Sequence, residues 1–104
     1  MERALVLDPG YLEALVFKGD ISYDQGKRTD SGSRRRKYEA LALEAYRTAA
    51  DSSRDKNFQA MMYFKTGNVY ADLSNDRQRA TEYWQRSVST APNSKAARLA
   101  GERL

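Results

Sequence analysis

The 104-residue chain contains no cysteine and no histidine, and it has only two prolines and one tryptophan. Disulfides, thiol nucleophiles, imidazole bases and the common zinc sites are therefore excluded. Because proline, valine and isoleucine are scarce, helices are favoured over strands. No apolar run approaches the roughly 20 residues of a membrane span, and the N-terminus lacks the apolar core of a signal peptide. We expect a cytoplasmic protein with no membrane span, no metal and no cofactor.

The net charge of +4 is concentrated in one short segment. Residues 27–37 carry six basic side chains and one acid, and the rest of the chain sums to −1. Four consecutive cations lie in this segment, namely Arg34, Arg35, Arg36 and Lys37. Such a run can contact RNA, anionic lipid or an acidic protein surface. Four adjacent cations cannot all face one way on a helix, however, so a lengthened, solvated hairpin loop is the alternative interpretation.

The spacing of the apolar residues predicts five helices. We expect them at about 11–25, 34–51, 58–73, 77–90 and 95–104, preceded in residues 1–7 by the end of another helix. The predicted connections are 8–10, 27–33, 52–57, 74–76 and 92–94. Gly26 is expected to stop the first helix, and the expected N-caps include Ser31 or Ser33, then Ser94.

Two of the predicted helices carry the same sparse pattern. A small residue is followed four positions later by an aromatic residue and three positions after that by another small one. The copies are Ala42, Tyr46 and Ala49, then Ala80, Trp84 and Ser87, with Pro92 five residues further on. Each copy follows a helix that contains a glycine and a tyrosine, Gly19 with Tyr23 and Gly67 with Tyr70. Repetition of this kind indicates a stacked-repeat architecture.

These residues resemble the tetratricopeptide repeat (TPR) family, whose unit of about 34 residues is a helical hairpin. In that family the first helix carries a glycine and a tyrosine, the second carries alanine, an aromatic and alanine, and a proline closes the unit. The resemblance implies antiparallel helix-hairpin repeats stacked as a right-handed α-solenoid fragment within a single all-α domain. Its parts would be the end of a preceding repeat (1–9), a first repeat (11–53), a second repeat (57–93) and a capping or truncated helix (95–104).

The chain departs from the family between Gly19 and Ala42, where it is about eleven residues longer than the repeat requires. The extra length coincides with the basic segment 27–37. We therefore interpret this segment as an insertion between the two helices of the first repeat.

The resemblance also implies a concave groove that holds a partner protein or peptide and is lined by the first helix of each hairpin. The groove residues would be Glu13, Val16, Asp20, Tyr23, Asp24, Met61, Phe64, Asn68 and Asp72. Since four of these are acidic, a basic or mixed partner is favoured over an acidic one. The alternative is that the apolar members are ordinary packing residues and the acids are solvated.

The leading functional hypothesis is a non-catalytic protein–protein interaction module, a TPR-like scaffold or adaptor. An enzyme is not expected, because the acids have no histidine, cysteine or glycine-rich phosphate cradle near them, and no catalytic residue can be named. One alternative is an anion-binding domain that contacts RNA or acidic surfaces through residues 27–37. Another is a structural repeat fragment that forms homo-oligomers through its exposed ends.

Overall fold

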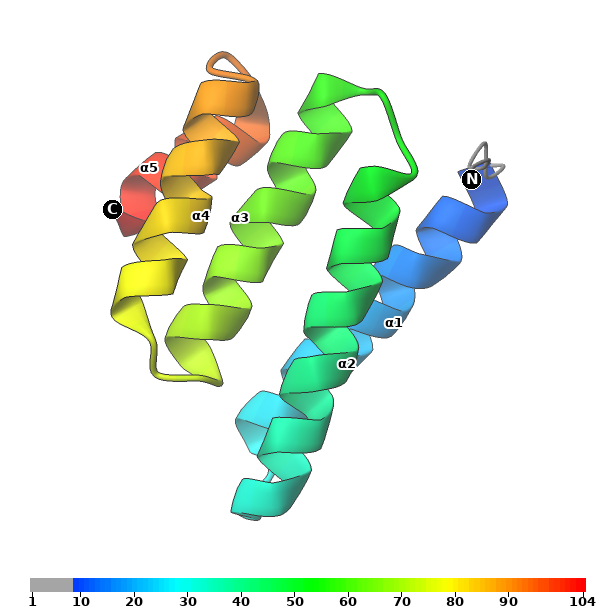
Figure 1. Cartoon of the computed structure of the whole chain (residues 1–104), viewed down its shortest axis with the longest axis vertical. Coiled ribbons are helices and arrows are strands. Elements are labelled where there is room, and N and C mark those ends of the chain that lie inside the picture. Colours follow the sequence, from blue (N-terminus) through cyan, green and yellow to red (C-terminus); the bar gives the residue numbers. More distant parts are fainter. Residues whose placement is uncertain (1–8) are drawn as a thin grey trace.

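The computed structural model describes residues 9–104 and consists of five consecutive helices (Figure 1). They are α1 (Pro9–Arg28), α2 (Gly32–Asp51), α3 (Lys56–Asp72), α4 (Arg77–Thr90) and α5 (Lys95–Arg103). Successive helices run in opposite directions and are joined by short turns (Figure 1). Because residues 9–104 contain no strand, the predicted all-α class is confirmed for this part of the chain. The helix end predicted for residues 1–7 lies outside the described residues.

The helices pack as two hairpins and a final helix. α1 packs against α2, and α3 packs against α4, while α2 also contacts α3 and joins the two hairpins. The last helix, α5, rests on both α3 and α4. This arrangement is the predicted helix-hairpin packing.

In each hairpin, the glycine of the first helix lies directly against the aromatic residue of the repeated pattern. A Cβ placed on Gly19 would lie 2.5 Å from Cε1 of Tyr46, and one placed on Gly67 would lie 2.5 Å from Cδ1 of Trp84. Tyr46 and Trp84 are both buried. The missing side chain of each glycine thus gives space to the aromatic ring of the second helix, so the hairpin backbones approach closely there.

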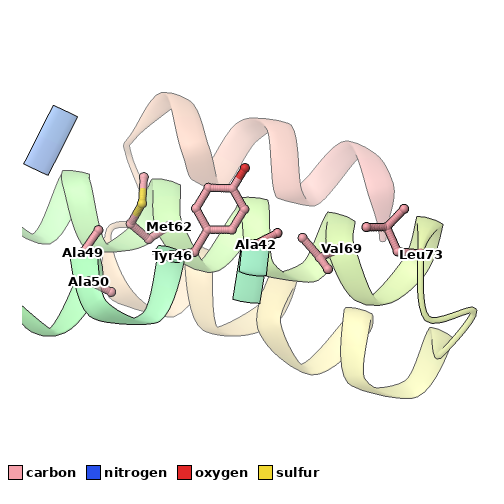
Figure 2. Close-up of a cluster of buried hydrophobic side chains, with 7 residues drawn as sticks. All are labelled: Ala42, Tyr46, Ala49, Ala50, Met62, Val69 and Leu73. Atoms are coloured by element: carbon pink, nitrogen blue, oxygen red, sulfur yellow. The ribbon is translucent and has the colours of Figure 1, made fainter. Parts of the chain in front are cut away.

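The main core lies between α2 and α3. Figure 2 shows its members: Ala42, Tyr46, Ala49 and Ala50 come from α2, and Met62, Val69 and Leu73 come from α3 and its C-cap. A second cluster of Ala80, Trp84 and Ala100 joins α4 to α5. Since half of these residues are alanines, the helices can pack at short range around a few large side chains.

The prediction of a polar loop at residues 27–33 is wrong, because α1 continues to Arg28 and α2 already begins at Gly32. The side chain of Ser31 caps α2 by accepting a hydrogen bond from the backbone N–H of Arg34 at 3.2 Å. Gly26 is not a helix stop: it is buried in α1, where a Cβ would lie 2.7 Å from Cδ1 of Leu73. The basic segment 27–37 therefore belongs mostly to the two helices of the first hairpin, and only residues 29–31 lie outside them.

Other helix ends follow from local capping. Pro9 and Gly10, which were predicted to form a turn, are the first two residues of α1, where proline loses no intrahelical hydrogen bond. α3 begins two residues earlier than predicted because the Asp55 carboxylate accepts a hydrogen bond from the N–H of Asn57 at 2.9 Å. Ser94 caps α5 as predicted.

Candidate functional site

A hollow of about 560 Å³ opens between α1 and α3. The backbones of these two helices approach each other less closely than those of α3 and α5 do. The walls of the hollow are mainly apolar, but three charged residues also line it. The lining residues are Leu12, Glu13, Val16, Phe17 and Asp20 of α1, with Phe58, Met61, Met62 and Lys65 of α3. We call this feature the α1/α3 hollow.

Four of the predicted groove residues meet in this hollow, and Asp20 is the most tightly held of them. Its carboxylate accepts a hydrogen bond from the Tyr46 hydroxyl at 2.6 Å and one from Nζ of Lys65 at 3.0 Å. Burial and the hydrogen bond to Asp20 raise the pKa of Tyr46 above its ordinary value, so this hydroxyl keeps its proton. The other three predicted residues in the hollow are Glu13, Val16 and Met61.

Three further predicted residues, Tyr23, Asn68 and Asp72, are joined by Arg103 of α5. The Arg103 guanidinium donates to Oδ1 of Asn68 at 2.8 Å and to Oδ1 of Asp72 at 3.2 Å. The Tyr23 hydroxyl also donates to Asp72, and Nε1 of Trp84 donates to Asn68 at 3.2 Å. This network ties α1, α3, α4 and α5 together, so these side chains hold the helices in place.

The network keeps Asp72 ionised. Partial burial acts to raise the pKa of Asp72, but the hydrogen bonds from Arg103 and Tyr23 outweigh it, and the pKa lies below its ordinary value. Burial and the contact with Asp72 in turn raise the pKa of Tyr23. The charge of Asp72 is therefore neutralised within the protein.

The predicted acidic character of the groove is largely cancelled by internal ion pairs. Asp20 pairs with Lys65 and Asp72 with Arg103, as above, and Asp24 pairs with Arg28 of the next helical turn at 3.1 Å. Glu13 is the acid of the hollow that has no ion pair among residues 9–104. Within the described part of the chain, it is the acid that gives this site negative charge without an ion pair.

The structure separates Phe64 and Asp24 from the hollow. Phe64 is half-buried and packs against the clusters shared by α3, α4 and α5. Five further residues line the hollow but are not among the predicted groove residues, namely Leu12, Phe17, Phe58, Met62 and Lys65. Leu12 and Val16 are four residues apart on one face of α1, and this spacing could have indicated Leu12 as well.

The four consecutive cations lie in the first turns of α2 and point to more than one side. Arg35 is half-buried, and its guanidinium donates to the Thr29 carbonyl at 2.9 Å. Arg35 and Arg36 line one shallow hollow, whereas Arg34 lines another. Arg34, Arg35 and Arg36 therefore do not all line one hollow, and anion binding by this segment stays a prediction.

Comparisons with known protein families, with curated proteins and with solved structures find no match for this chain. The TPR resemblance therefore rests on the repeated residues and stays a prediction. No helix in the described part is both long and apolar enough to cross a lipid bilayer. Residues 9–104 also hold no group of three or more carboxylates placed to bind a metal ion.

Proposed function

We propose that this chain is a non-catalytic, TPR-like interaction module that holds a partner peptide in the α1/α3 hollow. The observation that carries the proposal is the hollow itself, a concave and mainly apolar site of a size that commonly binds ligands. The ion pair between Asp20 and Lys65 and the network around Arg103 hold its helices. Rigid walls reduce the entropy that a bound peptide must overcome.

A repeat-like stacking of the two hairpins supports the TPR assignment and the proposed solenoid. Met62 and Val69 lie five residues before and two residues after Gly67, and α2 covers both. The residues at the same offsets from Gly19 are Ala14 and Ile21, and both are exposed. α1 thus presents to solvent the face that its counterpart α3 buries against the preceding helix.

The lining of the hollow suggests the chemistry of the partner. Its apolar walls, which include Val16, Phe17 and Met61, fit one or two apolar side chains. Glu13, which has no ion pair in the described part of the chain, favours a basic residue beside them. The proposed partner is therefore a peptide of mixed character in which an apolar anchor adjoins a lysine or arginine.

A peptide selection tests this function. We expect peptides selected from a displayed random library to share an apolar anchor next to a basic residue. Val16→Asp and Met61→Glu should each weaken the binding of a selected peptide about 10- to 100-fold, because burial of one such side chain contributes roughly 1.5–3 kcal/mol. Fluorescence polarisation of the labelled peptide measures the effect.

The matched control is Ile21→Glu, which also introduces an acid on α1 but lies outside the hollow. It should leave the affinity unchanged. Peptides that bind Val16→Asp and Met61→Glu as well as they bind the unmodified protein would remove the hollow as the site. Circular dichroism of each variant establishes that the helices are intact.

Self-assembly is a second candidate function, and the exposed face of α1 favours it. Phe17 is 66% exposed and Ile21 42% exposed, although both are large and apolar. We expect two copies to pair through this face, so the sedimentation coefficient should rise with protein concentration. The Ile21→Glu variant should sediment as a monomer. A stable monomer over a wide concentration range argues against this role. The anion-binding alternative has less support, because Arg35 and Arg36 line one hollow and Arg34 lines another.

A further inference from the structure

A second hollow, of about 310 Å³, lies among α2, α3 and α4 and includes no residue of α1. We call it the tyrosine pocket, because Tyr63, Tyr70 and Tyr83 form much of its wall. The other lining residues are Leu43, Tyr46, Arg47, Ala50, Asp51, Thr66 and Arg86. None of them was predicted to bind a partner, and none lines the α1/α3 hollow.

The aromatic rings and Arg86 of the pocket form a packed group. The rings of Tyr70 and Tyr83 are stacked with centroids 5.5 Å apart, and those of Tyr63 and Tyr83 are 6.3 Å apart. The Arg86 guanidinium lies 5.4 Å from the Tyr63 centroid and 5.2 Å from the Tyr83 centroid. Arg86 is therefore held in position before any ligand binds, while the edge of its guanidinium can still donate hydrogen bonds.

The pocket has more hydrogen-bond donors than the protein uses. No residue in the described part of the chain accepts a hydrogen bond from the hydroxyls of Tyr63, Tyr70 and Tyr83, and no carboxylate there pairs with Arg47 or Arg86. Burial and the neighbouring Tyr83 raise the pKa of Tyr70, so its hydroxyl stays protonated. These groups together form a set of donors that suits an acceptor-rich ligand.

The remaining polar groups of the pocket indicate which charge the ligand carries. The hydroxyls of Tyr46 and Thr66 are already used, since they donate to Asp20 at 2.6 Å and to the Met62 carbonyl at 2.8 Å. Asp51 lines the pocket as well and offsets one of the two guanidinium charges. The lining therefore retains a net positive charge, which favours an anion over a cation.

We propose that the tyrosine pocket binds a small aromatic oxyanion, an aromatic ring that carries a phosphate or carboxylate group. The ring packs against the tyrosine faces and the apolar side chains of Leu43 and Ala50. The oxyanion accepts hydrogen bonds from Arg86, from Arg47 and from the tyrosine hydroxyls. This inference is independent of the peptide site, because the two hollows share no lining residue.

Titration of the ¹⁵N-labelled protein with phenyl phosphate and with benzoate tests the proposal. We expect saturable amide shifts that map to the pocket helices around Tyr63 and Tyr83. Phenol, which lacks the oxyanion, should bind much more weakly, and so should benzylamine, which carries the opposite charge. Binding of benzylamine in preference to phenyl phosphate would overturn the proposal, because it would make Asp51 the dominant charge.

Two pocket variants and one control separate specific binding from general charge attraction. Arg86→Gln should weaken phenyl phosphate binding about 10- to 100-fold, as expected for the loss of a charge-assisted hydrogen bond, and Tyr63→Phe should weaken it less. Arg98→Gln makes the same charge change at an exposed position of α5 and should have no effect. Equal weakening by Arg98→Gln, or no weakening by Arg86→Gln in a folded protein, contradicts the proposal.

The oxyanion can come from a free small molecule or from a phosphotyrosine of another protein. A phosphotyrosine peptide that binds far more tightly than phenyl phosphate, and loses this affinity in Arg86→Gln, identifies the second source. Equal affinities identify the first. Val16→Asp, which alters the α1/α3 hollow, should not change the affinity for phenyl phosphate or for the phosphotyrosine peptide. A negative result for the tyrosine pocket can therefore be distinguished from a negative result for the peptide site.

Discussion

Replacement of Trp84 by alanine should lower the free energy of unfolding by about 3–5 kcal/mol. Trp84 is fully buried and is the largest such side chain in the described part of the protein. Its ring fills the space beside Gly67, and the guanidinium of Arg103 lies 4.7 Å from its centroid. The substitution leaves a cavity between α3, α4 and α5 and also removes the indole donor to Asn68.

The size of this effect can be judged against the stability of small domains, which is about 5–15 kcal/mol. Trp84→Ala should therefore remove a large part of the total. Urea denaturation followed by circular dichroism measures it without depending on tryptophan fluorescence. Phe17→Ala is the matched control, because it truncates an aromatic residue that is 66% exposed and should change stability by less than about 0.5 kcal/mol. Equal losses in the two variants would show that Trp84 is not a core residue.

The hairpin contacts could be predicted from the sequence because their residues are unusual in size and recur with fixed spacing. Gly67 and Trp84 were identified as members of the two repeated patterns, and the structure places them in contact. The same reasoning failed at Gly26, which was interpreted as a helix stop but is a packing glycine like Gly67. Within a helical pattern, the residue type alone does not distinguish the two roles, because the distinction depends on what the neighbouring helix presents.

The predicted loop at residues 27–33 failed for a related reason. The exposed turns of a helix are as polar as a loop, so amino-acid composition could not distinguish helix from loop at residues 27–33. The start of α2 depends instead on the N-cap at Ser31. Part of the α1/α3 hollow could be predicted, since the resemblance to the TPR family implies Val16 and Met61 as groove residues and both line the hollow. The neutralisation of Asp20 by Lys65 could not, because the pair is 45 residues apart in sequence and exists only after α1 and α3 are packed.

Alanine substitutions at two helical glycines should change stability in opposite directions. Gly101 lies in α5 with no atom within 4 Å of an added Cβ, so Gly101→Ala should stabilise the protein by roughly 0.5–1 kcal/mol through helix propensity. At Gly67 the added Cβ would lie 2.5 Å from the Trp84 ring and 3.1 Å from the Ala80 carbonyl oxygen. Gly67→Ala should therefore destabilise by about 1–3 kcal/mol. Urea denaturation of both variants measures the two changes.

A double variant identifies the cause of the loss at Gly67. If the Trp84 ring is the obstacle, Gly67→Ala should cost less in a Trp84→Leu background, because the smaller side chain leaves room for the new methyl group. The two positions are in contact, so their effects are not expected to be additive. A cost that is unchanged in the Trp84→Leu background would assign the loss to the Ala80 carbonyl, and a gain at Gly67 equal to that at Gly101 would contradict the close approach of α3 and α4. Because Gly19 and Tyr46 make the equivalent contact between α1 and α2, the same cycle at that pair tests whether the two hairpins are held by one repeated arrangement.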